Sequence, residues 1–131
     1  MKQLRLLHIA ICGSAVIMAL LFGSLRSLTP GMVMEPEQMV TWIMLGVALS
    51  MILGATVFRT RISAMRVGDD EGAWVEANRA PAILFWALLE GSVAVAALSI
   101  FMGANPWFGG GLAAVGLGLL ISQSPGTLAG H

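Results

Sequence analysis

One carboxylate lies inside an otherwise uncharged apolar stretch, and it is the residue of this sequence best suited to chemistry. Glu90 follows ten residues after Ala80, the first residue of that stretch. At about 1.5 Å per residue, a helix would carry Glu90 about 15 Å from its start, close to the midplane of a bilayer. A charged carboxylate costs about 2.5 kcal/mol or more at that depth. We therefore expect Glu90 to be protonated, paired with another molecule, or facing a wet cavity.

Three interpretations of Glu90 are open. A protonated carboxyl could hydrogen-bond across helices, which stabilises a membrane protein by about 1 kcal/mol. A carboxyl that loads and releases a proton could handle ions. A carboxylate close to the rings of Trp86 and Phe85 could hold a cation through cation–π contacts. His8 is expected near the membrane surface, about 9 Å from Glu90 in depth, so it is not expected to be the partner of Glu90.

No other set of residues has the spacing of a catalytic or metal site. There is no Ser/His/Asp combination, and His8 has no second histidine inside the apolar runs with which to bind haem. Gly109, Gly110 and Gly111 open an apolar run, so we interpret them as packing residues rather than as a phosphate-binding loop. The sequence therefore predicts no enzyme activity, no cofactor and no metal.

The composition is that of a membrane protein. Of the 131 residues, 57% are hydrophobic and 11% are charged, whereas soluble domains carry about 25% charged residues. The net charge is zero and no basic stripe is present, which argues against nucleic acid as a partner. The single cysteine, Cys12, cannot form a disulfide within the chain.

The elements that would position Glu90 are four apolar runs. They cover residues 6–25, 39–58, 80–102 and 107–121. The first three are long enough for a helix to cross a bilayer, which takes about 20 residues. The fourth is shorter, and we expect it to span the membrane with help from Ser122 and Gln123. The first run is longer than the apolar region of a signal peptide, so it is expected to be retained. The sequence predicts an all-α integral membrane four-helix bundle, forming a single domain over residues 1–131.

The basic residues predict the orientation of this bundle. With four spans, six of the seven basic residues fall on one side of the membrane, and Arg26 falls on the other. By the positive-inside rule, the side with six is the cytoplasm, which places both termini there. Trp42 and Trp107 begin their spans at the outer surface, where indole rings favour the headgroup layer. The six are Lys2, Arg5, Arg59, Arg61, Arg66 and Arg79.

The outer connections are expected to differ in length and order. The connection over residues 26–38 contains helix breakers and is expected to be irregular. These breakers are Pro30, Gly31 and Pro36. The turn at residues 103–106 is tight, so the third and fourth runs are expected to form an antiparallel hairpin.

The cytoplasmic connection over residues 59–79 is expected to contain the start of a helix. The acidic run Asp69, Asp70 and Glu71 suits the positive end of a helix dipole. A helix beginning there could continue into the third run. Pro81 would then kink that helix or mark a fresh first turn.

Small residues recur every four positions in three of the runs. Residues four apart stack on one helix face, and small side chains there let two helices approach closely. Ordinary packing inside the bundle explains such stripes. A sharper interpretation is that they contact other chains, because a bundle of this size has little interior. The candidate packing residues are Ala15, Ala19, Gly23, Gly46, Ser50, Gly54, Gly91, Gly110, Ala114 and Gly118.

The segment around Glu90 resembles one found in small, uncharacterised four-helix bacterial membrane proteins. It reads Ala-Leu-Leu-Glu-Gly over residues 87–91. The early Leu-Leu-His ending at His8 and the outer Asn105-Pro106 turn are similar to features of the same proteins. The resemblance implies an architecture and a bacterial cytoplasmic (inner) membrane, and it implies no activity.

The chain also resembles the proteolipid c-type subunits of rotary ATPases, which are glycine-rich helical hairpins with one mid-membrane carboxylate. The dipeptides Gly13-Ser14 and Gly91-Ser92, seventy-eight residues apart, indicate two hairpins in tandem. Glu90 would lie in the first helix of the second hairpin, whereas the proteolipid carboxylate lies in the second helix. Small multidrug-resistance exporters are similar in having four short helices and one membrane glutamate, but theirs lies in the first helix.

Two functions follow as expectations. The short loops and the small-residue stripes predict a small integral subunit, or an assembly or stabilising factor, of a larger membrane protein complex. Its partners would be the lipid bilayer and either other membrane subunits or copies of itself. The alternative is a homo-oligomer that translocates protons or cations through a site centred on Glu90.

Overall fold

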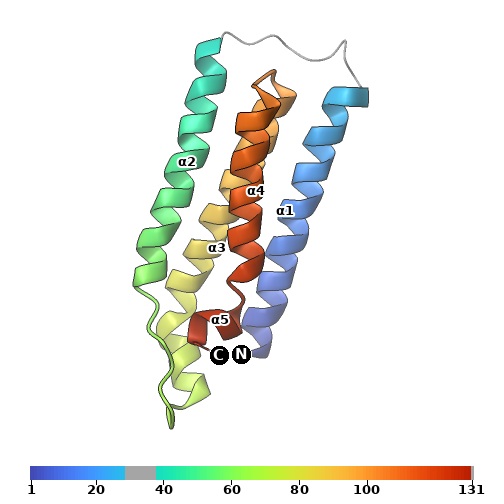
Figure 1. The fold of residues 1–131 in the computed structure, drawn as a ribbon. Helices are drawn as coiled ribbons and strands as arrows, with labels where there is room; N and C mark the ends of the chain where they lie inside the picture. Colours follow the sequence, from blue (N-terminus) through green and yellow to red (C-terminus); the bar gives the residue numbers. More distant parts are fainter. Residues whose placement is uncertain (29–37, 131) are drawn as a thin grey trace.

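The computed structural model describes residues 1–28 and 38–130, which are helical apart from short connections (Figure 1). The helices are α1 (Lys2–Leu28), α2 (Gln38–Thr60), α3 (Glu71–Phe101), α4 (Pro106–Ser122) and α5 (Pro125–Ala129). The all-α prediction is confirmed over the described residues. Of the connection over residues 26–38 that was predicted to be irregular, residues 26–28 belong to α1 and residue 38 begins α2. The part with Pro30, Gly31 and Pro36 lies outside the described residues.

Three helices are long and apolar enough to cross a membrane. They are α1, α2 and α3. α1 and α2 contain their predicted spans, and α3 contains the third span except for its last residue, 102. α4 is apolar but has only 17 residues, a length of about 25 Å, against a hydrocarbon core of about 30 Å. By length and composition the chain therefore fits a multi-pass membrane protein, and the count of four spans stays a prediction.

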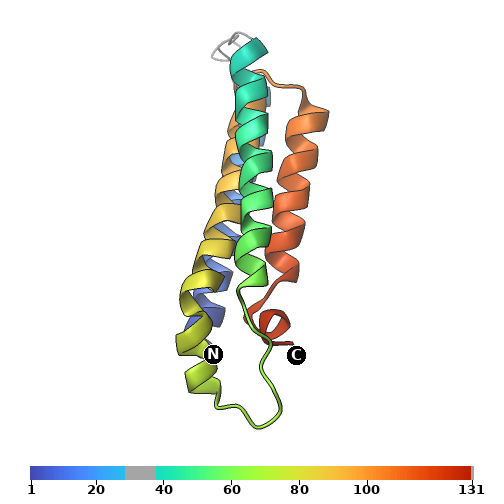
Figure 2. The same ribbon diagram turned by 90° about the vertical axis from the view of Figure 1, so that its left-hand side faces the viewer.

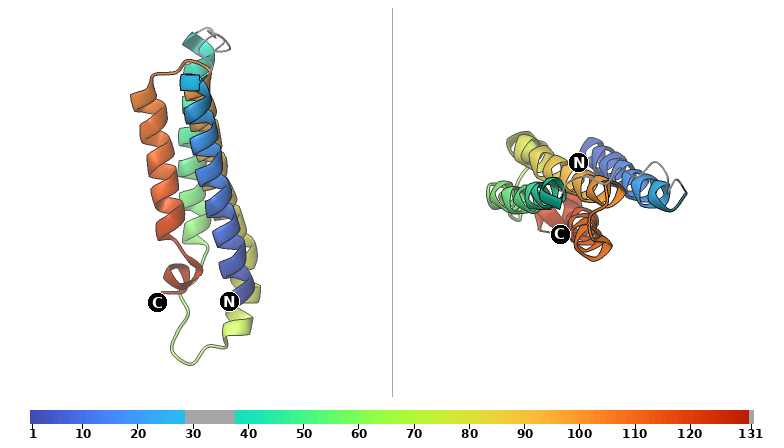
Figure 3. Two further views of the ribbon diagram at one scale, coloured as in Figure 1. Left: turned by 90° about the vertical axis from the view of Figure 1, so that its right-hand side faces the viewer. Right: turned by 90° about the horizontal axis from the view of Figure 1, so that it is seen from above.

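α3 is the central helix of the molecule. It packs against α1, α2 and α4, and these three interfaces are larger than those between the other described helices. Seen from above, α1 and α2 lie on opposite flanks of α3, with α4 against a third face (Figure 3). α3 and α4 form the antiparallel hairpin predicted from their tight turn. The tandem-hairpin arrangement is wrong for the first half, because α1 and α2 each bury their apolar face on α3 instead of on each other.

The spacing of seventy-eight residues was predicted to relate one hairpin to the next. In the structure it relates α1 to α3 instead. α1 and α3 run in the same direction side by side (Figure 1). Contacts between them keep this offset: the ring centroids of His8 and Trp86 are 4.9 Å apart. Arg26 donates to the carbonyl of Ile100 in α3, 74 residues later, and to that of Ala104 in the turn after α3, 78 residues later. An offset of 74 to 78 residues is therefore the register of these two parallel helices. The glycines of the two dipeptides do not set it, because Gly91 faces Met51 of α2 and a Cβ on Gly13 would meet no atom within 4 Å.

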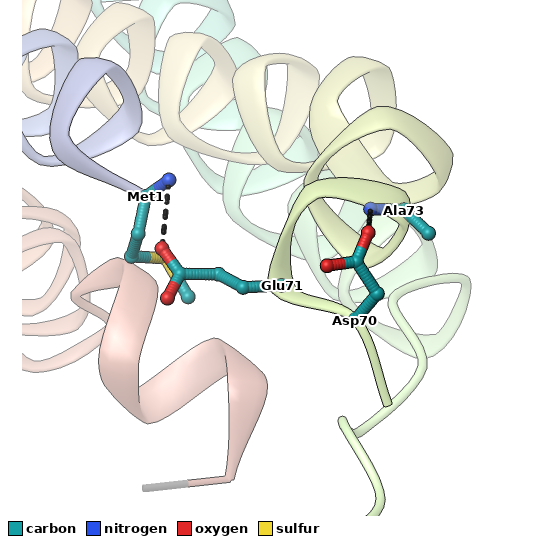
Figure 4. A network of polar contacts seen from close by, with 4 residues as sticks. All are labelled: Met1, Asp70, Glu71 and Ala73. Atoms are coloured by element: carbon teal, nitrogen blue, oxygen red, sulfur yellow. Dashed lines mark hydrogen bonds and ion pairs between the residues drawn. The ribbon is translucent and has the colours of Figure 1, made fainter. Parts of the chain in front are cut away.

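α3 begins at the acidic run, as predicted. The Asp70 carboxylate accepts a hydrogen bond from the Ala73 N–H at 3.0 Å, which satisfies a donor that the first turn leaves free. Figure 4 shows this cap beside the ion pair between the Met1 amino group and the Glu71 carboxylate, at 3.1 Å. α3 then continues through Pro81 to Phe101. Much of the predicted connection over residues 59–79 is therefore helix, and the non-helical part is 61–70.

Two buried side chains hold the connection between α2 and α3. The Trp74 indole N–H donates to the Ser63 carbonyl at 2.7 Å, and the Ser63 N–H donates to Asn78 Oδ1 at 2.9 Å. The Met65 N–H donates to the Ala129 carbonyl at 3.0 Å. This last bond ties α5, which the sequence did not predict, to the connection beneath the end of α4 (Figure 2).

Glycines let α3 approach its neighbours closely. A Cβ added to Gly116 of α4 would lie 2.7 Å from Ser92 Oγ and 3.0 Å from Val93 Cγ2. On the other flank of α3, Gly91 packs against the Met51 side chain of α2. In lipid, close packing of this kind replaces the hydrophobic effect as the main attraction between helices.

We expect Gly116→Ala to lower the free energy of unfolding by about 1–3 kcal/mol, because the added methyl must push α4 or Ser92 aside. Gly118→Ala is the matched control, since a Cβ at Gly118 would meet no atom within 4 Å. Both changes bring the same gain in helix propensity. Denaturant titrations in detergent micelles, followed by circular dichroism, compare the two variants. Equal stability would contradict the close contact between α3 and α4.

Candidate functional site

Polar side chains from neighbouring helices gather where α4 ends. The carbonyl groups in the last turn of a helix have no partner within the helix, and in lipid each unpaired group costs several kcal/mol. His8 of α1 donates from Nε2 to the Leu120 carbonyl at 2.8 Å. Trp86 of α3 donates from Nε1 to the Gln123 carbonyl at 2.9 Å. Two helices therefore supply the donors that the end of α4 requires.

The two donors also pack against each other. The His8 and Trp86 rings are tilted by 54°. Trp86 is fully buried and His8 is 7% exposed. Because a carbonyl oxygen can only accept, the hydrogen bond to Leu120 requires a proton on His8 Nε2. His8 was predicted to be a residue of the membrane surface. The structure makes it a buried contact between α1, α3 and α4, and its depth in the membrane stays a prediction.

Gln123 extends this group to α2. Its side-chain Oε1 accepts a hydrogen bond from Arg59 Nε at 3.2 Å. Arg59 lies in the last turn of α2, where a cation is favourable because helix C-termini carry partial negative charge. His8, Trp86, Gln123 and Arg59 together are called the α4 cap below. The α4 cap joins all four long helices through side chains.

Glu90 lies one helical turn beyond Trp86. It is half-buried, and it forms no hydrogen bond or ion pair with residues 1–28 or 38–130. Its carboxylate is within electrostatic range of the Cys12 thiol on α1. Cys12 Sγ is in turn 3.5 Å from His8 Nε2. The structure thus brings Glu90 close to the α4 cap and leaves its carboxyl without a partner in the described chain.

The aromatic residues predicted to line a cation site are both core residues. Trp86 belongs to the α4 cap and directs its N–H at Gln123. Phe85 is buried in the same core cluster. Within the part of the chain that the structure describes, no group of three or more His, Cys, Asp or Glu side chains could hold a metal ion.

A second cap lies at the C-terminal end of α3. Arg26 of α1 donates from Nη1 to the carbonyls of Ile100 and Ala104, both at 3.0 Å. α1 therefore caps both helices of the hairpin, with His8 at the end of α4 and Arg26 at the end of α3. Neither role was predicted from the sequence. The signal was weak, because α1 carries several polar residues near each end, of which His8 and Arg26 are only two.

The predicted packing residues divide into two groups. The first group contacts neighbouring helices of this chain: Ala15, Ala19, Gly54 and Gly91. The second group faces outward, because each residue is exposed or leaves open space where a Cβ would lie: Gly23, Gly46, Ser50, Gly110, Ala114 and Gly118. Gly116 and Gly109, by contrast, are buried on α4, and Gly116 was not predicted.

An open groove separates α1 from α4, because both helices pack mainly on α3. Its volume is about 510 Å³, and it is called the α1–α4 groove below. Its walls are Ile9, Cys12, Gly13, Val16 and Ile17 of α1, with His8 below and Ile121 of α4 opposite. A Cβ on Gly13 would meet no atom within 4 Å. The space beside this wall is therefore open to a side chain of another molecule.

The fold and composition define an all-helical protein that fits a multi-pass membrane protein. The chain matches no protein-family model, no curated protein and no solved structure. The resemblances described above therefore stay predictions.

We expect His8→Phe to lower the free energy of unfolding by about 1 kcal/mol, because the ring still packs on Trp86 while the Leu120 carbonyl loses its donor. His8→Gln is the control that keeps a donor. Denaturant titration measures the stability of each variant, and hydrogen exchange at residues 119–123 reports on the end of α4. Unchanged exchange in His8→Phe would contradict the role of His8 in the α4 cap.

Proposed function

We propose that this chain is a small integral subunit, or an assembly or stabilising factor, of a larger membrane protein complex. The observation that supports this proposal is that small residues of the chain face outward beside an open groove. On α4, Ala114 is exposed, and a Cβ on Gly110 or Gly118 would meet no atom of this chain. In lipid, a smooth face of small residues lets the backbone of another helix approach closely.

The small residues of α4 and the α1–α4 groove form one surface. Ala114 and Ile121 are seven positions apart on α4, so they lie on the same helix face. Ile121 lines the groove, and Gly13 opens the opposite wall. A transmembrane helix of a partner subunit would fit this surface with its backbone near α4 and its side chains in the groove.

In this proposal the chain crosses the inner membrane of a bacterium four times, with both termini in the cytoplasm. The distribution of basic residues supports this orientation. Both ends of the described chain lie at the same end of the molecule (Figure 1). At the opposite end, Trp42 and Trp107 are 58% and 88% exposed, as indole rings in a headgroup layer would be.

Glu90 favours a second function, in which several copies of the chain translocate protons or cations. The observation behind it is a half-buried carboxyl within α3 that has no partner among the described residues. Such a carboxyl in a membrane helix must be neutral or paired with a group from another molecule. A second copy of this chain, or a transported ion, would provide that group.

We expect Ala114→Trp to release the partner subunits, because an indole on the small-residue face would keep the partner backbone away. Native mass spectrometry of gently extracted membranes measures the ratio of partner to this chain, which we expect to fall at least fivefold. Leu21→Trp is the control, since Leu21 is exposed on α1 and does not line the groove. Recovery of the unaltered chain as a lone monomer would exclude the proposed function.

Proton translocation requires that Glu90→Gln lower the flux into proteoliposomes at least tenfold, because an amide cannot release a proton. Glu76→Gln is the matched control, since Glu76 is an exposed carboxylate near the start of α3. A hydrophobic carbodiimide tests the same carboxyl directly, because it labels carboxyls that are protonated within lipid. Equal flux in the wild type and Glu90→Gln would eliminate this second function.

A further inference from the structure

A second cleft, between α2 and α4, has a polar mouth. The mouth lies where α2 begins and α3 turns into α4, at the end of the molecule away from the termini. Its volume is about 600 Å³. The polar residues that line it are Arg26, Thr41 and Asn105, beside the rings of Trp42 and Trp107. The mouth is therefore a polar pocket at the level of the exposed tryptophans.

The mouth continues into an apolar groove of about 350 Å³ between α2 and α4. Trp42, Leu45 and Phe108 line both parts, so the mouth and the groove adjoin, and together they are called the α2–α4 cleft. The Trp42 and Phe108 ring centroids are 5.6 Å apart where the two parts join. Beyond them the walls are Gly46, Leu49 and Leu112. The cleft thus changes from polar to apolar along α2, as the membrane does from headgroups to acyl chains.

The mouth carries positive charge. Arg26 uses Nη1 for the carbonyls at the end of α3, and its Nη2 and Nε have no acceptor among the described residues. The first turn of α4, capped by Asn105, also lines the mouth, and the start of a helix carries partial positive charge. None of the described residues that line the mouth is Asp or Glu. The end of α3 offsets only part of the Arg26 charge, because a helix C-terminus carries a partial negative charge. The described lining of the mouth is therefore net positive.

We propose that this cleft binds one acidic phospholipid, with its phosphate beside Arg26 and one acyl chain in the groove toward Leu49. The guanidinium fork suits phosphate oxygens, because it presents several N–H donors in one plane. From Trp42 to Leu49 the groove follows about 10 Å of helix, which accommodates the upper part of an acyl chain. The exposed Trp42 and Trp107 belong at the depth of the headgroups.

The positive charge at the mouth of the cleft favours an acidic lipid over the other possible occupants. The ammonium group of a zwitterionic lipid would find no carboxylate among the described lining residues, whereas a headgroup with net negative charge complements Arg26. A partner helix could fill the apolar groove, but it would leave the free N–H groups of Arg26 without an anion. The proposal does not depend on the partner subunit described above, which would lie on another face of α4.

The test is native mass spectrometry of the purified full chain titrated with phosphatidylglycerol or phosphatidylethanolamine. We expect one phosphatidylglycerol per chain, bound at least fivefold more tightly than phosphatidylethanolamine. Arg26→Gln should weaken binding of phosphatidylglycerol at least fivefold. Lys2→Gln is the control, because it removes the same charge at the other end of α1 and should change nothing.

Arg26 also caps α3, so Arg26→Gln could weaken lipid binding by destabilising the fold. A second variant is therefore needed to test binding separately from stability. Gly46→Leu would fill the groove without touching Arg26, because a Cβ on Gly46 would meet no atom of this chain. We expect it to weaken phosphatidylglycerol binding at least fivefold while leaving the melting temperature in pure detergent unchanged. Undiminished binding in Gly46→Leu, equal affinity for the two lipids, or a protein chain found in the cleft would each overturn the proposal.

Discussion

The carbonyl groups at the ends of α3 and α4 need hydrogen-bond donors, and this need determines how the other helices are placed. A helix that ends in or near lipid has carbonyl groups that water cannot satisfy. α1 meets this requirement at both ends of the hairpin, since Arg26 donates at the end of α3 and His8 at the end of α4. Trp86 adds the donor for Gln123. No buried side-chain nitrogen or oxygen in the described residues lacks a partner.

These hydrogen bonds account for the arrangement of helices around α3. For α1 to reach both helix ends it must lie parallel to α3, with the register set by His8 beside Trp86. α2 then packs on the opposite flank, where Gly91 meets Met51. α4 lies on a third face through Gly116. Because α3 occupies the centre, α4 does not fill the space to α1 or α2, and a cleft remains along each side.

The two clefts and Glu90 are what this chain offers to other molecules. The α1–α4 groove is apolar and continues into a face of small residues, which suits a helix of another subunit. The α2–α4 cleft has a cation at its mouth, which suits a lipid phosphate. Glu90 lies on α3 within electrostatic range of Cys12 on α1, and its carboxyl lacks a partner among the described residues. A chain with little interior thus presents chemically different surfaces on different sides.

The sequence by itself determined the four long helices, but not α5, because hydropathy and end signals act locally. Apolar runs gave the membrane helices, Asp70 began α3, and the tight turn at residues 103–106 gave the α3–α4 hairpin. Only the tertiary structure decided which helices of the chain pack against each other. Whether α1 packs on α2 or α3 depends on distant hydrogen bonds such as His8 to Leu120 and on contacts such as Gly116 with Ser92. A periodicity of small residues shows that a helix face can pack closely, but not which chain it packs against.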